Sequence, residues 1–156
     1  MSNVKLRPAT TDDAERVWNW RNEPSVRAAS RESEPIPLDD HKRWFERRLQ
    51  ESDVMILIVS GEDGIDIGYV RFEIEADEAE ISVALDPESR GMGLGTAAIR
   101  SASDLLINTG RVRTIVALIK PGNEGSVRAF SNAGYDVADG SDDDSDLIKM
   151  ACVSRR

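Results

Sequence analysis

A strand that leads into a glycine-rich turn and then into a helix is the feature that most constrains this chain. Residues 81–96 read ISVALDPESRGMGLGT, in which an apolar strand pattern is followed by Arg90, Gly91, Gly93 and Gly95. Glycine lets the backbone adopt positive φ and approach a ligand closely. The first N–H groups of a new helix have no partner inside it and can bind an anion, to which Arg90 adds a cation. The segment therefore predicts a site for a pyrophosphate.

Two well-known phosphate loops do not fit this segment. A P-loop needs G-x-x-x-x-G-K-[ST], and no lysine follows the glycines here. A dinucleotide fingerprint needs G-x-G-x-x-G, but the sixth residue from Gly91 is Thr96, and no clean βαβ repeat surrounds it. A glycine-rich turn that binds nothing remains the structural alternative.

Strand and helix patterns alternate along the whole chain, which predicts an α/β fold with a mixed sheet. Six Asp between residues 136 and 146 predict a solvated acidic loop. Pro24 is expected to end the first helix, and residues 25–36 are expected to form a polar loop. The expected strands are 4–7, Val54–Ser60, 65–74, 79–85, Thr114–Ile119, 135–138 and 147–153, and the expected helices are 10–23, 38–51, 93–108 and 123–133.

Composition narrows the class of protein. The 156 residues, 40 % of them hydrophobic, predict a single domain over residues 1–156. Cys152 is the only cysteine, which fits a reducing compartment, and neither an 18-residue apolar run nor an apolar leader is present, so we expect a cytoplasmic protein with no membrane partner. The net charge of −9 argues against a nucleic-acid partner. Residues 1–50 carry 10 Lys/Arg and 9 Asp/Glu, whereas residues 51–156 carry 10 and 20.

Two motifs in order resemble those of the GNAT superfamily of N-acetyltransferases. Arg90, Gly93 and Gly95 occupy the fixed positions of its acetyl-CoA pyrophosphate loop, [QR]-x-x-G-x-[GA]. Residues 123–135, NEGSVRAFSNAGY, resemble its N-x-x-[AS]-x-x-x-[YF]-x-x-x-G-[FY] helix and following strand. The resemblance covers residues 4–153. It implies an α/β fold of the GNAT type, with a mixed, mostly antiparallel central sheet of about six to seven strands flanked by four helices.

The N-terminal third resembles a particular branch of that superfamily. Residues 20–27, WRNEPSVR, and 41–45, HKRWF, are similar to W-R-N-x-x-x-[VI]-R and H-x-x-W-[FL]. This pair is typical of the branch that acetylates amino sugars on nucleotide carriers, as in pseudaminic-acid biosynthesis. N-terminal acetyltransferases of ribosomal proteins have a similar core and stay open as an alternative.

The resemblance implies direct transfer of acetyl from acetyl-CoA, as a co-substrate and without a metal, to a primary amine. In this family, backbone amides of the strand before the glycine loop face the oxyanion that forms during transfer, here those of Val83, Ala84 and Leu85. Asn123 is expected to hydrogen-bond the pantetheine arm with help from Ser126. The expected residues of the acetyl-CoA site are Val83, Ala84, Leu85, Arg90, Gly91, Met92, Gly93, Leu94, Gly95, Thr96, Asn123, Ser126 and Phe130.

An amine is mostly protonated at pH 7, so the site needs a base or a water chain. Glu80 is the first candidate, because it opens the strand that leads to the glycine loop, where some family members use a carboxylate; an exposed strand-end carboxylate is the alternative. His41 is the second candidate, and a satisfied core histidine is its alternative. Many family members place a proton-donating tyrosine where this chain has Phe130. A dedicated general acid is therefore not expected there.

We expect the acceptor to be a small-molecule amine, most simply a nucleotide-linked amino sugar, bound by a monomer or a homodimer. The least acidic part of the chain, residues 1–50, suits such an anionic carrier. A protein N-terminal amine is the alternative substrate, and a non-catalytic acyl-CoA-binding module is the alternative function. The expected acceptor-binding residues are Trp20, Arg21, Asn22, Arg27, Trp44 and Arg71, and packing in the core is the alternative for each of the two tryptophans.

Overall fold

Seven strands form one mostly antiparallel sheet in the computed structural model, which describes residues 3–29, 34–91, 93–138 and 146–154. The sheet order is β1-β2-β3-β4-β5-β7-β6, and only the β4–β5 pair is parallel. The strands are β1 (Lys5–Pro8), β2 (Val54–Ser60), β3 (Asp66–Glu75), β4 (Glu78–Leu85), β5 (Thr114–Ile119), β6 (Asp136–Val137) and β7 (Ile148–Val153). The helices are α1 (Ala14–Asn22), α2 (Pro24–Ala29), α3 (Leu38–Gln50), α4 (Leu94–Asn108) and α5 (Glu124–Asn132), with short 3₁₀ turns at Thr11–Asp13 and Pro87–Ser89.

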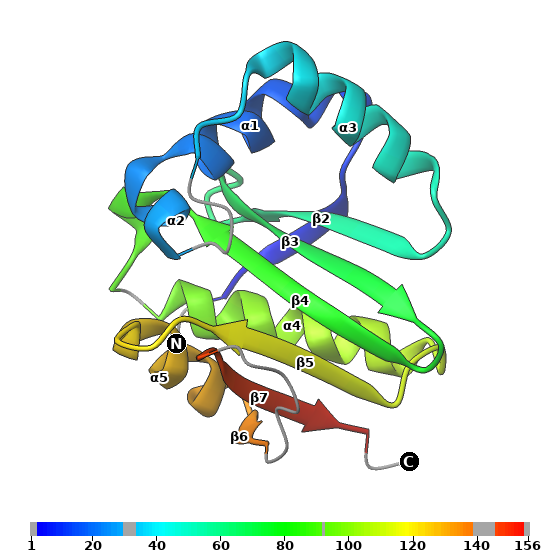
Figure 1. The fold of residues 1–156 in the computed structure, drawn as a ribbon, viewed down its shortest axis with the longest axis vertical. Helices are drawn as coiled ribbons and strands as arrows, with labels where there is room; N and C mark the ends of the chain where they lie inside the picture. Colours follow the sequence, from blue (N-terminus) through cyan, green and yellow to red (C-terminus); the bar gives the residue numbers. More distant parts are fainter. Residues whose placement is uncertain (1–2, 30–33, 92, 139–145, 155–156) are drawn as a thin grey trace.

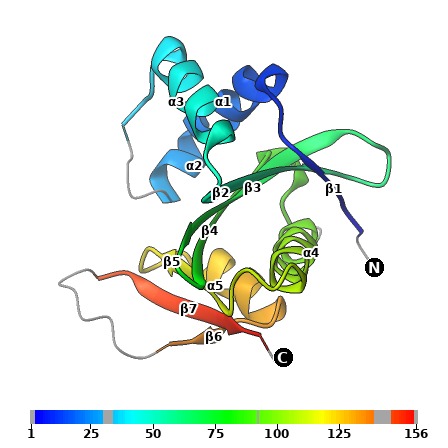
Figure 2. The ribbon, with the colours of Figure 1, turned by 90° about the vertical axis from the view of Figure 1, so that its right-hand side faces the viewer.

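The helices cover both faces of the sheet (Figures 1 and 2). Helices α4 and α5 pack on the larger core, in which Ile99, Leu106 and Phe130 meet alternate residues of the strands. Helices α1 and α3 pack on the smaller core of the opposite face, through Val17 and Phe45. The central strands β2, β3 and β4 thus contribute buried residues to both cores, as helices on either face of a sheet require. The expected α/β architecture is confirmed.

The strands at 54–60 and 114–119 have the bounds that their continuous apolar runs predict. The segment after Pro24 does not follow the prediction, because residues 24–29 are helical and raise the number of α-helices in the described residues to five. Proline is well accepted at the start of a helix, where its missing N–H needs no partner. Glu23 Oε2 accepts hydrogen bonds from the N–H groups of Ser25 at 3.0 Å and Val26 at 3.1 Å, so a carboxylate caps this short helix. Most of the acidic loop, residues 139–145, lies outside the described residues.

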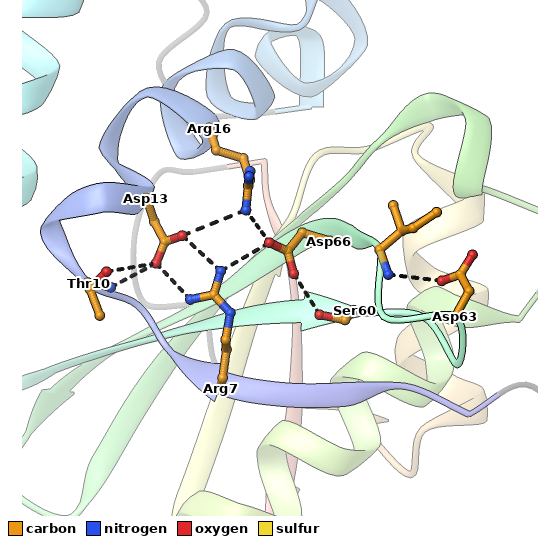
Figure 3. A network of polar contacts seen from close by, with 8 residues as sticks. Arg7, Thr10, Asp13, Arg16, Ser60, Asp63 and Asp66 are labelled. Carbon is orange, nitrogen blue, oxygen red and sulfur yellow. Dashed lines mark hydrogen bonds and ion pairs between the residues drawn. The ribbon is translucent and has the colours of Figure 1, made fainter.

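A polar network fastens the start of the chain to the hairpin of β2 and β3 (Figure 3). Arg7 donates to both carboxylate oxygens of Asp13 at 2.9 Å and to Asp66 at 3.0 Å. Arg16 contacts both carboxylates, and Ser60 Oγ donates to Asp66 at 2.7 Å. The Arg7 guanidinium holds the pKa of the buried Asp13 carboxyl below its usual range. The network therefore orients α1 against the sheet only while both carboxylates stay ionised.

Candidate functional site

Strands β4 and β5 separate partway along their length (Figure 1). They pair only from Glu78 with Thr114 to Glu80 with Val116, although both strands continue beyond these residues. The N–H of Asp86 donates to Ile67 at 2.7 Å across the β3–β4 ladder. Because antiparallel residues alternate in the direction of their hydrogen bonds, the backbone groups of residues 81, 83 and 85 point away from β3. They face the gap between β4 and β5.

The beginning of α4 lies just beyond the end of β4. Gly93 has φ 76° and turns the chain into the helix, and the first intrahelical bond runs from Ala97 N–H to Gly93 C=O at 3.1 Å. The preceding N–H groups, those of residues 94–96, therefore have no partner within the helix, and the N-cap residue, Gly93, makes no side-chain hydrogen bond to them. Aligned amides at a helix N-terminus attract an anion. The predicted anion site thus has the expected backbone geometry.

Arg90 ties this loop to the rest of the fold. Its guanidinium donates to Leu85 C=O at 3.1 Å and to Ser25 Oγ at 2.6 Å, and it lies 3.6 Å from Glu23 Oε2. The side chain thus links the end of β4 to α2. Its positive charge remains next to the helix N-terminus, where it favours a bound anion.

A groove of about 1410 Å³ joins the β4–β5 gap to the space under α2 and α3. Five lining side chains are basic (Arg21, Arg71, Arg90, Lys120 and Arg128) and three are acidic (Glu34, Glu73 and Glu80), whereas the whole chain carries −9. The groove thus concentrates positive charge in an acidic protein. The predicted site residues that line it are Arg21, Trp44, Arg71, Glu80, Val83, Ala84, Leu85, Arg90, Gly91, Gly93, Gly95, Thr96, Asn123, Ser126 and Phe130.

The α5 wall of the groove carries no phenol at the position of the usual tyrosine. Phe130 is almost buried there, and its ring meets the edge of Tyr135 with centroids 5.0 Å apart. The Tyr135 hydroxyl shares a hydrogen bond of 2.7 Å with Ser103, away from the groove lining, and burial raises its pKa. Asn123 Oδ1 accepts from Ser126 N–H at 3.2 Å, so the asparagine caps α5.

On the α3 face of the sheet, charged side chains alternate across β3 and β4. Glu73 lies directly opposite Glu80, and Arg71 lies opposite Ser82. Arg48 of α3 donates to Glu73 Oε1 at 2.8 Å, and Arg71 reaches Ser82 Oγ at only 3.4 Å. All of these except Arg48 line the groove. Glu80 thus sits beside the splayed part of β4 with a second carboxylate across the ladder.

His41 is not placed to act as a base. The side chain is fully buried and is absent from the groove lining. One ring nitrogen, Nε2, lies 2.7 Å from Ala14 C=O and therefore donates, which leaves Nδ1 to accept from Arg21 at 3.0 Å. Burial, helped by the charge of Arg21, lowers the pKa of His41 to about 4. This placement fits the alternative interpretation, a buried histidine with both ring nitrogens hydrogen-bonded, one of them to Arg21.

Several predicted contact residues lie in supporting positions outside the groove lining. Trp20 is buried and stacks on Tyr69 with centroids 6.2 Å apart. Asn22 exchanges hydrogen bonds of 2.9 Å with both backbone groups of Ile36, and Arg27 Nε donates to Asn22 C=O at 3.0 Å. The W-R-N motif therefore mainly holds the segment around Ile36, a residue that lines the groove. Leu94 also lies outside the lining, and Met92 lies outside the described residues.

Other residues that line the groove were not predicted from the sequence. Glu73 follows Arg71 at a spacing of two, so the strand alternation places both on one face, but only the register shows that Glu73 opposes Glu80. Tyr69 lines the groove through the same alternation. Burial raises its pKa, an effect that the charges of Arg71 and Arg21 moderate. Lys120 and Arg128 follow β5 and carried no motif signal.

Within the described ranges, no cluster of three or more His, Cys, Asp or Glu side chains could hold a metal ion. Among the helices of those same ranges, none is long and apolar enough to cross a membrane.

Known proteins share this arrangement. The protein "Putative phosphinothricin acetyltransferase YwnH" of Bacillus subtilis (strain 168) is 25 % identical over 139 residues, which cover 85 % of this chain and 83 % of that protein. A structure of AAC(6')-Ib in complex with ribostamycin and coenzyme A superposes with a TM-score of 0.83 and 23 % identity, covering 97 % of this chain and 93 % of that one. The spermidine N-acetyltransferase from Vibrio cholerae, in complex with CoA and spermine, superposes with a TM-score of 0.84 and 18 % identity, covering 97 % and 95 %.

The structural matches, at these low identities, describe the fold alone. The sequence itself matches the family described as "Acetyltransferase (GNAT) domain" over residues 3–136, which is most of the chain. The chain belongs to the acetyltransferase (GNAT) domain family.

Proposed function

We propose that this protein moves the acetyl group of acetyl-CoA directly to the primary amine of a small molecule that carries negative charge. The separation of β4 from β5 beside the uncapped N-terminus of α4 is the observation that carries the proposal. A nucleotide-linked amino sugar is the acceptor that the N-terminal motifs favour. The excess of basic side chains along the groove supports an anionic acceptor as well as an anionic co-substrate.

The residues present fit acetyl-CoA, which supplies the activated acetyl thioester when it is bound. The N–H groups at the start of α4, with Arg90 beside them, suit its pyrophosphate. The backbone groups of Val83 and Leu85, which face the β4–β5 gap, suit an extended arm and the thioester oxygen. At about 1410 Å³, the groove exceeds the roughly 300–1,000 Å³ of a typical single-ligand pocket, so it has space for a second substrate.

Glu80 is the base in this proposal. Its carboxylate lines the groove at the last residue of β4 that pairs with β5, next to the backbone groups assigned to the thioester. The carboxylate takes a proton from the acceptor ammonium, directly or through water. The amine nitrogen then bonds to the acetyl carbon as the carbon–sulfur bond breaks, and the nitrogen loses its second proton to solvent. Because Phe130 offers no proton, the departing thiolate is protonated by solvent.

Release of free CoA thiol tests the proposal. Wild-type protein with acetyl-CoA is offered amino-sugar nucleotides, peptides with free N-termini, and polyamines. Thiol release that depends on an amino-sugar nucleotide supports the proposal, whereas release only with peptides identifies a protein acetyltransferase. Acetyl-CoA binding by calorimetry without release for any amine would identify a non-catalytic acyl-CoA-binding module instead.

A further inference from the structure

We propose that the acceptor is zwitterionic, with its ammonium held at Glu80 and an anionic group close by held between Arg21 and Arg71. The inference rests on the proposed function and names the class of acceptor for that site. A carboxylate or a phosphate satisfies the same chemistry. A free amino acid and a phosphate-linked amino sugar would therefore both present an ammonium with an anionic group close to it.

Two guanidiniums and one indole form the part of the site that would bind the anionic group of the acceptor. The Arg21 guanidinium carbon lies 4.1 Å from the centre of the Trp44 ring and that of Arg71 lies 5.2 Å from it, and all three side chains line the groove. Both cations therefore lie against the same indole ring and come from different elements, α1 and β3. Guanidinium groups suit carboxylate and phosphate because their N–H donors form a planar fork.

Arg71 lacks a full set of protein partners. Its Nε is buried and has no hydrogen-bond partner among the described residues. Glu73 Oε1 lies 3.7 Å from this Nε and accepts a hydrogen bond from Arg48 at 2.8 Å. Because Nε itself is buried, a ligand in the groove would accept from the terminal N–H groups of Arg71, a side chain that is partly exposed and lines the groove.

Arg21 is positioned rather than left to fluctuate. The neutral Nδ1 of His41 accepts its hydrogen bond at 3.0 Å, and that imidazole is itself anchored on Ala14 C=O at 2.7 Å. The rings of His41 and Trp44 also pack together, with centroids 5.7 Å apart. A buried anchor of this kind holds the guanidinium over Trp44 before a ligand arrives, which reduces the entropy lost on binding.

The part of the site that would bind the ammonium lies one same-face residue pair away along the β3–β4 ladder. Glu80 and Glu73 are direct cross-strand partners, whereas Arg71 and Ser82 form the next pair on the same face. Diagonal neighbours of this kind have Cα or Cβ atoms about 7–8 Å apart. The ammonium and the anionic group of the acceptor must therefore lie close together in one compact molecule. A polyamine, which has only positive charges, would meet Arg21 and Arg71 with repulsion.

Matched acceptor pairs test the inference through kcat/KM for CoA release. The pairs are 4-aminobutyrate with 4-aminobutyramide, and a UDP-linked 4-amino sugar with the free amino sugar; spermidine is the polyamine. In at least one pair we expect the acidic member to be preferred at least tenfold, and the preferred pair identifies carboxylate or phosphate as the source. Arg71→Gln and Arg21→Gln should each remove most of that preference and leave the KM for acetyl-CoA unchanged. Arg43→Gln, the same change at an exposed residue of α3, should retain it.

Equal use of acidic and neutral members, or a preference for spermidine, would overturn the inference. Equal losses for both members of a pair in the arginine variants would also overturn it, because they would indicate a structural role. If no amine releases CoA, the proposed function fails, and tryptophan fluorescence still tests the anion site. Saturable quenching by 4-aminobutyrate or the UDP-sugar, but not by the neutral members, and its loss in Trp44→Phe would support the site; no quenching would refute it.

Discussion

Replacing His41 with glutamine should remove part of the decrease in the free energy of unfolding that the wild type shows as the pH falls. The imidazole is fully buried, and burial with the nearby Arg21 charge lowers its pKa from 6.5 to about 4. Between these values the unfolded chain binds a proton at His41 that the folded chain does not. Stability contributed by the neutral ring is therefore complete above pH 6.5 and is lost as the pH falls toward 4.

The size of the effect follows from the pKa gap. At about 1.4 kcal/mol per pKa unit, the full gap amounts to about 3 kcal/mol, of which about 2 kcal/mol is lost between pH 7.5 and 5. Urea unfolding followed by far-UV circular dichroism at these two pH values measures it. Glutamine does not titrate but can still donate to Ala14 C=O and accept from Arg21, so His41→Gln should lose most of the pH dependence.

The reasoning is refuted if His41→Gln unfolds with the same pH dependence as wild type. Its pH–rate profile supplies a second check. Since the ring only positions Arg21, we expect the profile of kcat to keep its shape while the acceptor KM rises. Loss of the acidic limb of kcat would instead show that His41 transfers the proton.

Three further substitutions probe catalysis and stability. Glu80→Gln should lower kcat by about 10²–10⁴-fold at pH 7, with a smaller loss at higher pH where more amine is neutral; a pH-independent loss would contradict a role as base. Asp13→Asn should lower the free energy of unfolding by about 1–2 kcal/mol in urea titrations, because it weakens the charged hydrogen bonds of Asp13 while Arg7 keeps Asp66 and partial exposure, whereas the exposed neighbour change Asp12→Asn should have little effect. Phe130→Tyr should change kcat by less than about threefold if thiolate protonation does not limit the rate, since a thiol of pKa about 8.5 is a fair leaving group; a large gain would show that the missing acid matters.

Much of the fold follows from the sequence for a physical reason. Continuous apolar runs of this length, such as Val54–Ser60, are typical of strands buried on both faces, and the bounds of this run agree with the structure. The loop predicted after Pro24 was wrong because a proline can follow the end of one helix and also start the next. The cap of the second helix comes from the Glu23 carboxylate, which accepts from residues two and three positions later, a local contact that the rule for proline does not include.

The candidate site also has a part that the sequence predicts and a part that it does not. The glycine loop and the end of β4 were predictable because backbone chemistry depends on local residue order. The acceptor side was predictable only in part, since Trp20 and His41 differ from Trp44 in which way they face, and one sequence cannot tell a buried aromatic from a groove residue. The opposition of Glu73 and Glu80 depends on strand register, which hairpin packing determines.

Acetyl-CoA binding at the start of α4 is the central claim, and calorimetric titration of paired glycine variants tests it most directly. Gly93 and Gly110 have φ of 76° and 79°, so valine strains the backbone alike at both, but only Gly93 lines the groove. We expect wild type and Gly110→Val to bind acetyl-CoA with equal affinity at one site, and Gly93→Val to show no binding while its circular dichroism stays native. Unchanged affinity in Gly93→Val would contradict the account.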